Sequence, residues 1–228
     1  NVFLYSYTAS SEEWKLVSGN GLNEETKDKL WSDAQTNYLT TRIIKDYQGS
    51  IVSKQTARFA LVNNAYRQTE VVDDPGGQAL KTEYTYFAQS AGALKYGKLK
   101  TAVHPDGSWS VYNYDSNGFR IEESVGWKDA GIGSGATQSI FYSYSPVVPG
   151  DVPVFNDQRP RTVTRQIMGQ IVAKTYWGYL TNAVRELTEI EEQCASPGAA
   201  YGDSGNLRRI MVYYGTNAMS HQVGRLKS

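Results

Sequence analysis

The chain has 228 residues, of which 40% are hydrophobic and 20% are charged. Its 23 basic residues balance 23 acidic residues, so no net field favours binding to nucleic acid or to an anionic membrane surface. No apolar run approaches the ~18 residues of a membrane helix, and no membrane insertion is predicted. The one cysteine, Cys194, excludes an intrachain disulfide framework and a thiolate zinc site.

Tyrosine is the unusual component of the sequence. The chain has 17 tyrosines and 5 tryptophans but only 6 phenylalanines. Rings with a polar tip suit a sheet surface on which one end of the side chain packs and the other meets water. The length allows one large all-β unit or two modest domains.

The segment 23–35, NEETKDKLWSDAQ, is predicted to form strand and turn. Its acidic residues would suit the first turn of a short helix, which is the alternative. Its apolar residues Leu30, Trp31 and Ala34 make a poor helical stripe, however.

A strand is predicted from Gly97, because Leu99, Thr101 and Val103 alternate with residues of the other face. Pro105, Asp106 and Gly107 then predict a turn: proline fixes φ, aspartate bonds nearby backbone, and glycine accepts a positive φ.

A second strand follows this turn. Tyr112 and Tyr114 lie on one face of it, and the segment from Asp115 to Gly118 ends it. The Asn-Gly pair in that segment is a strong hairpin signal. We expect Asp115 to accept backbone N–H groups and Gly118 to have a positive φ. A third strand begins near Phe119, so the region is predicted to be an antiparallel meander.

The sequence also contains an apparent internal duplication. TRIIKDYQGSIVSK from Thr41 is matched by RTVTRQIMGQIVAK from Arg161, so that Gly49 corresponds to Gly169 roughly 120 residues later. Further matches follow in the same order, and GKLKT from Gly97 corresponds to GRLKS from Gly224. We predict a first repeat unit over 1–126 and a second, truncated unit over 127–228, within one continuous β-sheet structure.

The hairpin formed by Tyr114, Asp115 and Gly118, with Tyr112 and the Pro-Asp-Gly turn before it, resembles the YD-repeat, or RHS-repeat, family. One full copy of the motif is present, and DYQG, QIMG and YYGTN are weaker relatives of it. The family usually has arginine directly after the glycine, whereas this chain has Phe119 and then Arg120.

The resemblance implies a fold of stacked antiparallel hairpins in a long β-ribbon that winds into a shell. It further implies a noncatalytic structural segment of a large secreted or surface-exposed bacterial protein. The expected partners are other repeats of the same chain, or identical copies that join through edge strands. The residues expected to carry this architecture are Gly49, Pro105, Asp106, Gly107, Tyr112, Tyr114, Asp115, Gly118 and Gly169.

Asp74-Pro75-Gly76-Gly77 is similar to an aspartate-proline motif at which some members of this family cut themselves. The leucine expected after the glycine is missing, so we predict a turn without cleavage.

Signals of catalysis are weak, and the prediction leans against an enzyme. His104 and His221 lack a partner at metal-binding spacing, and the glycine-rich segment around Gly133 lacks the end of a phosphate loop. Glu189 and Glu191 share a strand face but suit a solvated surface. No cofactor and no metal are predicted.

Three alternatives remain open. Trp109 and Trp127 could stack on sugars in a carbohydrate-binding or adhesive module, so polysaccharide is a possible partner. The long loops and scattered acids would also suit a secreted enzyme that acts on polysaccharide. Identical copies could instead join through open edges into a fibre.

Overall fold

The computed structural model describes the backbone of residues 3–8, 13–18, 24–32, 35–46, 48–151, 157–183, 185–215, 218 and 222–227, and the side chains of these residues from 29 onward. The chain divides into two compact units, Asn1–Ser110 and Val111–Ser228. The boundary lies inside strand β9 (Trp109–Tyr114).

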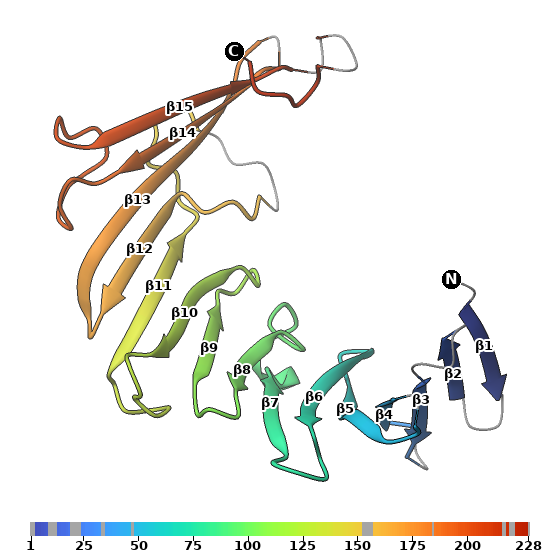
Figure 1. Cartoon of the computed structure of the whole chain (residues 1–228). Coiled ribbons are helices and arrows are strands. Elements are labelled where there is room, and N and C mark those ends of the chain that lie inside the picture. The colour runs from blue at the N-terminus through green and yellow to red at the C-terminus, as the bar shows by residue number, and fades with distance from the viewer. Residues whose placement is uncertain are drawn as a thin grey trace. The chain divides into compact units, whose positions relative to one another are not determined.

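The first unit is an antiparallel meander in which each strand pairs with the next one in the chain (Figure 1). Its strands are β1 (Phe3–Thr8), β2 (Glu13–Ser18), β3 (Glu24–Trp31), β4 (Asn37–Lys45), β5 (Ile51–Val62), β6 (Ala65–Asp73), β7 (Leu80–Tyr86) and β8 (Leu99–Val103). A short 3-10 helix, η1 (Gln89–Ala91), lies between β7 and β8. The segment 24–31 is therefore strand, as the sequence predicted.

The second unit has the same construction. Its strands are β10 (Arg120–Gly126), β11 (Thr137–Ser143), β12 (Thr162–Ile167), β13 (Gln170–Thr181), β14 (Leu187–Gln193) and β15 (Leu207–Tyr213), and each pairs antiparallel with the next. The all-β antiparallel meander expected from the alternating pattern is confirmed.

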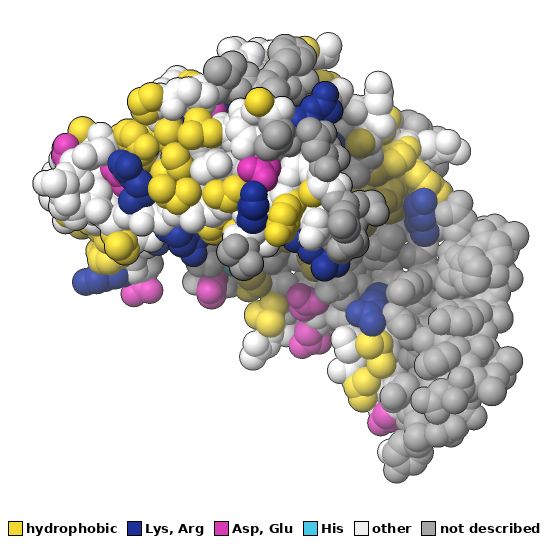
Figure 2. All heavy atoms as spheres, turned by 90° about the horizontal axis from the view of Figure 1, so that it is seen from above, with side chains coloured by type: hydrophobic (Ala, Val, Ile, Leu, Met, Phe, Trp, Pro, Cys, Tyr) yellow, Lys and Arg dark blue, Asp and Glu magenta, His cyan; other side chains and the backbone are white. Residues whose placement is uncertain are grey.

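Few of the hydrophobic side chains that the structure describes are buried in either unit. The buried hydrophobic residues among the described side chains are Ala57, Ala102, Trp109, Val148, Ile190 and Ala199. The largest fully buried side chains are both charged, Arg161 and Glu192. In Figure 2, hydrophobic side chains lie at the surface among charged ones. Strand ladders and polar contacts therefore carry much of the stability.

Aromatic rings contact one another across neighbouring strands. Tyr38 on β4 stacks on Phe59 of β5 with ring centroids 4.6 Å apart, and Trp31 of β3 lies 4.8 Å from Tyr38 on its other side. Cross-strand ring pairs of this kind stabilise a sheet by about 0.2–1 kcal/mol each. In this region the aromatic side chains therefore stabilise the sheet by packing against one another on its surface.

The strand pairing of β4 to β7 recurs in β12 to β15. Thr56↔Val72 in the first unit has its counterpart in Tyr176↔Glu192 of the second, about 120 residues later. The backbone bond from Asp74 N to Lys54 O (2.8 Å) likewise has its counterpart in that from Cys194 N to Lys174 O (3.0 Å).

The same bulge also occurs in both units. The register of β4 and β5 shifts between Ile44 and Lys45, and that of β12 and β13 shifts between Arg165 and Gln166. After the bulge the first unit has one further pair, Lys45↔Ile51, whereas the second unit has two, Gln166↔Ile171 and Ile167↔Gln170. Two distant stretches of the chain thus share one pattern of backbone pairing.

Candidate functional sites: hairpin loops and a groove on the sheet

Four of the described hairpin loops share one backbone geometry. In each five-residue loop the first N–H donates to the last carbonyl, and the fourth N–H donates to the first carbonyl. The fourth residue has a positive φ in every case. The loops are Asp46–Ser50, His104–Ser108, Asp115–Phe119 and Asn182–Glu186.

Asp115 closes its loop in the way that the sequence predicted. Its Oδ1 accepts the backbone N–H of Asn117 at 2.9 Å and that of Phe119 at 2.8 Å, while Gly118 has a φ of 77°. Both geometric expectations are confirmed. Asp46 makes the same pair of contacts, with Gln48 N and Ser50 N, each at 2.9 Å.

The Pro105–Gly107 turn uses a different acceptor. Here Asp106 Oδ1 accepts the N–H of Ser108 at 2.9 Å, and Gly107 N donates to His104 O at 3.0 Å. Hydrogen bonds from Ser108 lower the pKa of Asp106. His104 occupies the first position of this loop, whereas His221 lies outside the described residues.

Gly49 and Gly169, which the duplication paired, both have a positive φ but belong to different loops. Gly49 (φ 85°) is the fourth residue of a five-residue loop. Gly169 (φ 77°) follows Met168 (φ 50°) in the short connection between β12 and β13. Two successive positive φ values are typical of a type I′ hairpin turn.

Tyr112 and Tyr114 lie half-buried on β9, and burial raises the pKa of Tyr114. On the same strand, Asn113 Nδ2 donates to Glu122 Oε2 of β10 at 2.7 Å. The guanidinium of Arg120 lies 5.1 Å from the centre of the Tyr142 ring. The first contact joins the two strands of the tyrosine-bearing hairpin, and the second joins this hairpin to β11.

The two candidate sugar-stacking rings differ in exposure. Trp109 is only 4% exposed, so its ring offers no face on which a sugar could stack. The alternation of β9 could not reveal this burial, because it depends on neighbouring strands. Trp127 is half-buried in the loop between β10 and β11.

The acidic candidates are engaged in structural contacts. Asp73 Oδ1 accepts from Gln55 Nε2, and Asp74 Oδ2 accepts from the backbone N–H of Gln78. The backbone carbonyl of Asp74 accepts from Gly77 N and Ala79 N and closes the predicted turn. Glu191 pairs with Arg209 of β15. Within the described residues, no group of three or more His, Cys, Asp or Glu side chains lies close enough to hold a metal ion.

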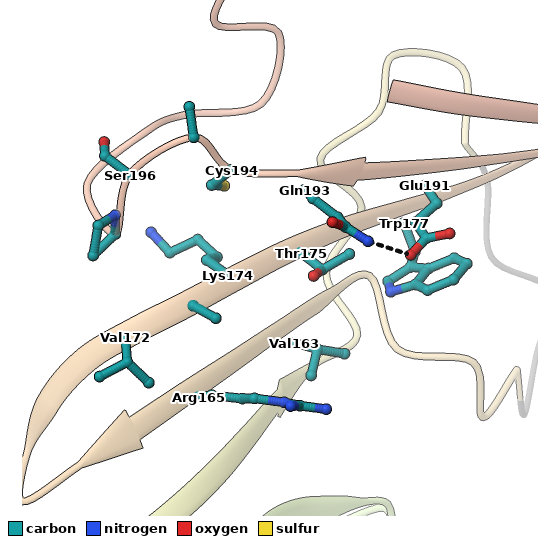
Figure 3. A pocket seen from close by; sticks show the side chains of 13 residues that line it. Val163, Arg165, Val172, Lys174, Thr175, Trp177, Glu191, Gln193, Cys194 and Ser196 are labelled. Carbon is teal, nitrogen blue, oxygen red and sulfur yellow. Dashed lines mark hydrogen bonds between the residues drawn. The ribbon is translucent and has the colours of Figure 1, made fainter. Parts of the chain in front are cut away.

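A groove of about 480 Å³ opens beside the first part of β13, where residues 172–175 and Trp177 line it (Figure 3). Trp177 and Thr175 line it from β13, Glu191 and Gln193 from β14, and the loop after Cys194 closes one end. We call it the Trp177 groove. Gln193 Nε2 donates to Glu191 Oε1 at 3.3 Å beside the indole. The groove could not be predicted from the sequence, because its walls come from three strands, β12, β13 and β14, and a loop.

The Trp177 groove has a smaller counterpart in the first unit. A groove of about 310 Å³ is lined by residues 51–54 of β5 and by Asp73 and Asp74. Lys54 in the first groove corresponds to Lys174 in the second. The second is larger because the loop 194–206 replaces the tight turn that follows Asp73.

Buried charges anchor two loops in the second unit. Arg161 donates to Asp151 at 2.6 Å and to Asp157 at 2.9 Å, and it lies 4.6 Å from the centre of the Tyr179 ring. Burial disfavours its charge, but the hydrogen bonds to both carboxylates outweigh this effect and raise its pKa. The network fastens the segment before β12 onto β13.

Glu192 holds the loop 194–206. Its Oε1 accepts Gly202 N at 2.6 Å and Asn206 Nδ2 at 2.7 Å, and Arg208 donates to Oε2. Burial alone would raise the pKa of Glu192, but these donors lower it. Sequence reasoning missed both Arg161 and Glu192, since nothing local distinguishes a buried charge from a solvated one.

No family model and no curated protein matches the chain. Among solved structures, it is similar to a porin-like protein from Bacteroides uniformis ATCC 8492, with 8% sequence identity and a TM-score of 0.36. That similarity covers 92% of this chain and 94% of the other. In the described part of the chain, no helix has the length and apolarity needed to cross a membrane.

Proposed function

We propose that this chain is a noncatalytic structural segment of a large secreted bacterial protein of the YD-repeat type, in which stacked hairpins form part of a β-sheet wall. The observation that carries the proposal is the recurrence of the β4–β7 pairing in β12–β15. Recurrent pairing is expected of a chain built by internal duplication.

The thin hydrophobic interior supports the same proposal. In a single hairpin each ring has side-chain neighbours on one side only, whereas in a wider sheet the strands on both sides contribute contacts. In the loops at Asp46 and Asp115 the aspartate carboxylate accepts the same pair of backbone N–H groups, so the two hairpins share one kind of end. Such a wall is stabilised by contacts between neighbouring strands rather than by a central core.

Hydrogen exchange measured by mass spectrometry tests this proposal. Gly118→Val weakens the loop between β9 and β10, so exchange should accelerate in β9, β10 and β11 because stability passes between nearest neighbours. Exchange in β13 to β15 should stay within about twofold of the original rate. Uniform acceleration across the second unit would contradict a wall of stacked hairpins.

Carbohydrate binding is the second candidate, and the Trp177 groove is the observation that favours it. An indole beside Gln193, Glu191 and Thr175 combines an apolar ring with hydrogen-bonding groups, which is the usual composition of a sugar site.

Isothermal titration with neutral and acidic polysaccharides, using Trp177→Ala and Trp127→Ala as matched variants, decides this candidate. Loss of heat only in Trp177→Ala would assign binding to the groove, and loss only in Trp127→Ala would assign it to the loop before β11. Absence of heat with the unaltered chain would remove the candidate.

A further inference from the structure

The segments that follow β7 and β15 share the backbone hydrogen bonds at their two ends. After β7, Phe87 N donates to Lys98 O and Gly97 N donates to Phe87 O, both at 3.0 Å. After β15, the counterparts are Tyr214 N to Arg225 O and Gly224 N to Tyr214 O, also both at 3.0 Å. Gly97 and Gly224 have φ values of 78° and 75°. In both loops the same backbone bonds bring the end of the loop back beside its start, at the end of β7 and of β15.

In the first unit the strand that follows this loop, β8, pairs with β7. Tyr86 pairs with Leu99, and β8 then continues along β7 with Tyr84↔Ala102 and Glu83↔Val103. The outer edge of β7 is thus covered by an antiparallel neighbour over most of its length.

In the second unit the same pairing begins. Tyr213 pairs with Leu226 as Tyr86 does with Leu99, and Lys227 N donates to Val212 O at 2.7 Å. From Leu207 to Met211, no described residue pairs with the outer edge of β15.

The side chains along the outer edge of β15 do not prevent a further strand from pairing with it. Leu207 and Ile210 are 70% and 57% exposed. Charged residues often discourage edge pairing, but Arg208 and Arg209 are turned to Glu192 and Glu191 of β14. An edge with apolar side chains and unpaired backbone groups is a template for a further strand.

We propose that the outer edge of β15 is a strand-accepting surface, and that its occupant is an antiparallel strand in the register that β8 takes on β7. The occupant has a small residue opposite Met211 and an apolar β-branched residue opposite Ile210, at the positions of Ala102 and Val103 in β8. This inference deepens the proposed function, because it names the partner and the register of a neighbouring hairpin.

The sequence of β8 itself meets these requirements. Val103 would lie opposite Ile210, where two apolar β-branched side chains pack well across a sheet. Ala102 is 5% exposed against Tyr84 in the first unit, and the flexible side chain of Met211 stands at the position of that tyrosine.

The test uses the whole chain with a short extension. Residues 102–114, AVHPDGSWSVYNY, are added after Ser228, which corresponds in sequence to Thr101. The matched control carries proline at both positions that copy Ala102 and Val103, since proline cannot donate to a ladder. Amide exchange in β15 is followed by mass spectrometry or NMR.

We expect the extension to slow exchange of the outward-facing amides between Leu207 and Val212 at least tenfold, and the proline control to leave them unchanged. Equal exchange in the two extended chains would overturn the inference. The Gly118→Val experiment perturbs the loop between β9 and β10 in the chain without the extension, so a failure here is distinguishable from a failure of the proposed function.

Discussion

Turn residues in this chain act through backbone conformation. In the five-residue loops the fourth residue has a positive φ: Gly49, Gly107 and Gly118 supply it without a Cβ, whereas Arg185 has a φ of 59° in the equivalent place. The left-handed region costs a residue with a side chain about 1–2 kcal/mol relative to glycine. The same loop geometry therefore has different energies at different positions.

Gly118→Val is expected to lower the free energy of unfolding by about 1–2 kcal/mol or more, because valine is β-branched and disfavours positive φ. Urea denaturation followed by circular dichroism measures the change. Gly131→Val is the matched control, since Gly131 has no positive φ and open space around its Cβ position. An equal loss in both variants would refute the assigned loop geometry.

Arg185→Gly is expected to have the opposite effect. Relief of the positive φ should outweigh the extra chain entropy of glycine and raise the free energy of unfolding by up to about 1 kcal/mol. The melting temperature should rise by a few degrees. A lower melting temperature would mean that the Arg185 side chain stabilises the loop in some other way.

The residues of a strand are constrained by the loops that pack on its face as well as by the strands that pair with it, and β13 is an example. Gly178 lies in the middle of β13, and a Cβ built on it would fall 2.3 Å from Val148 Cγ2. Val148 is 4% exposed, in the segment that Arg161 and Asp151 fasten to the sheet. Because Gly178 has no side chain, the loop that carries Val148 can pack directly against this face of β13.

Gly178→Ala is expected to destabilise the chain by about 1–3 kcal/mol through overpacking. The double variant Gly178→Ala with Val148→Ala should recover part of this loss, so that the two changes are non-additive by at least about 0.5 kcal/mol. Thermal unfolding of the two single variants and the double variant measures the coupling. Strict additivity would show that the two residues do not touch.

At the scale of the whole molecule, polar groups occupy places where a globular domain has apolar ones. Tyr179 is an example: burial, then the nearby charge of Glu189, raises its pKa to about 12. The guanidinium of Arg159 lies 4.1 Å from the centre of its ring. Global stability consequently depends on ionisation of groups at the sheet surface.

Stability is expected to fall as the pH rises from about 10 to about 12. In this window an unfolded Tyr179 loses its proton while the folded one keeps it, so ionisation favours the unfolded chain; below about pH 10 the contribution is constant. The loss is on the order of 1 kcal/mol after solvent screening. Urea denaturation at about pH 9 and about pH 11.5 should show a steeper decline for the original chain than for Tyr179→Phe. Parallel declines would contradict the shifted pKa.

The sequence by itself determined the local architecture. Alternation of period two predicted the strands around Leu99 and Tyr112, and the Asp-x-x-Gly pattern predicted the loop at Asp115, including its acceptor and its positive φ. These features depend on neighbouring residues in the chain. For that reason they can be derived without knowledge of the rest of the molecule.

Only the tertiary structure decided what the strands bury. Trp109 and Trp127 look alike in sequence, yet one is buried and the other partly exposed. The ionic contacts of Arg161 and Glu192, and the walls of the Trp177 groove, join strands with loops that local alternation does not position. Register and burial arise from contacts between segments far apart in the chain, and these depend on the free energy of the assembled sheet rather than on the preference of any single segment.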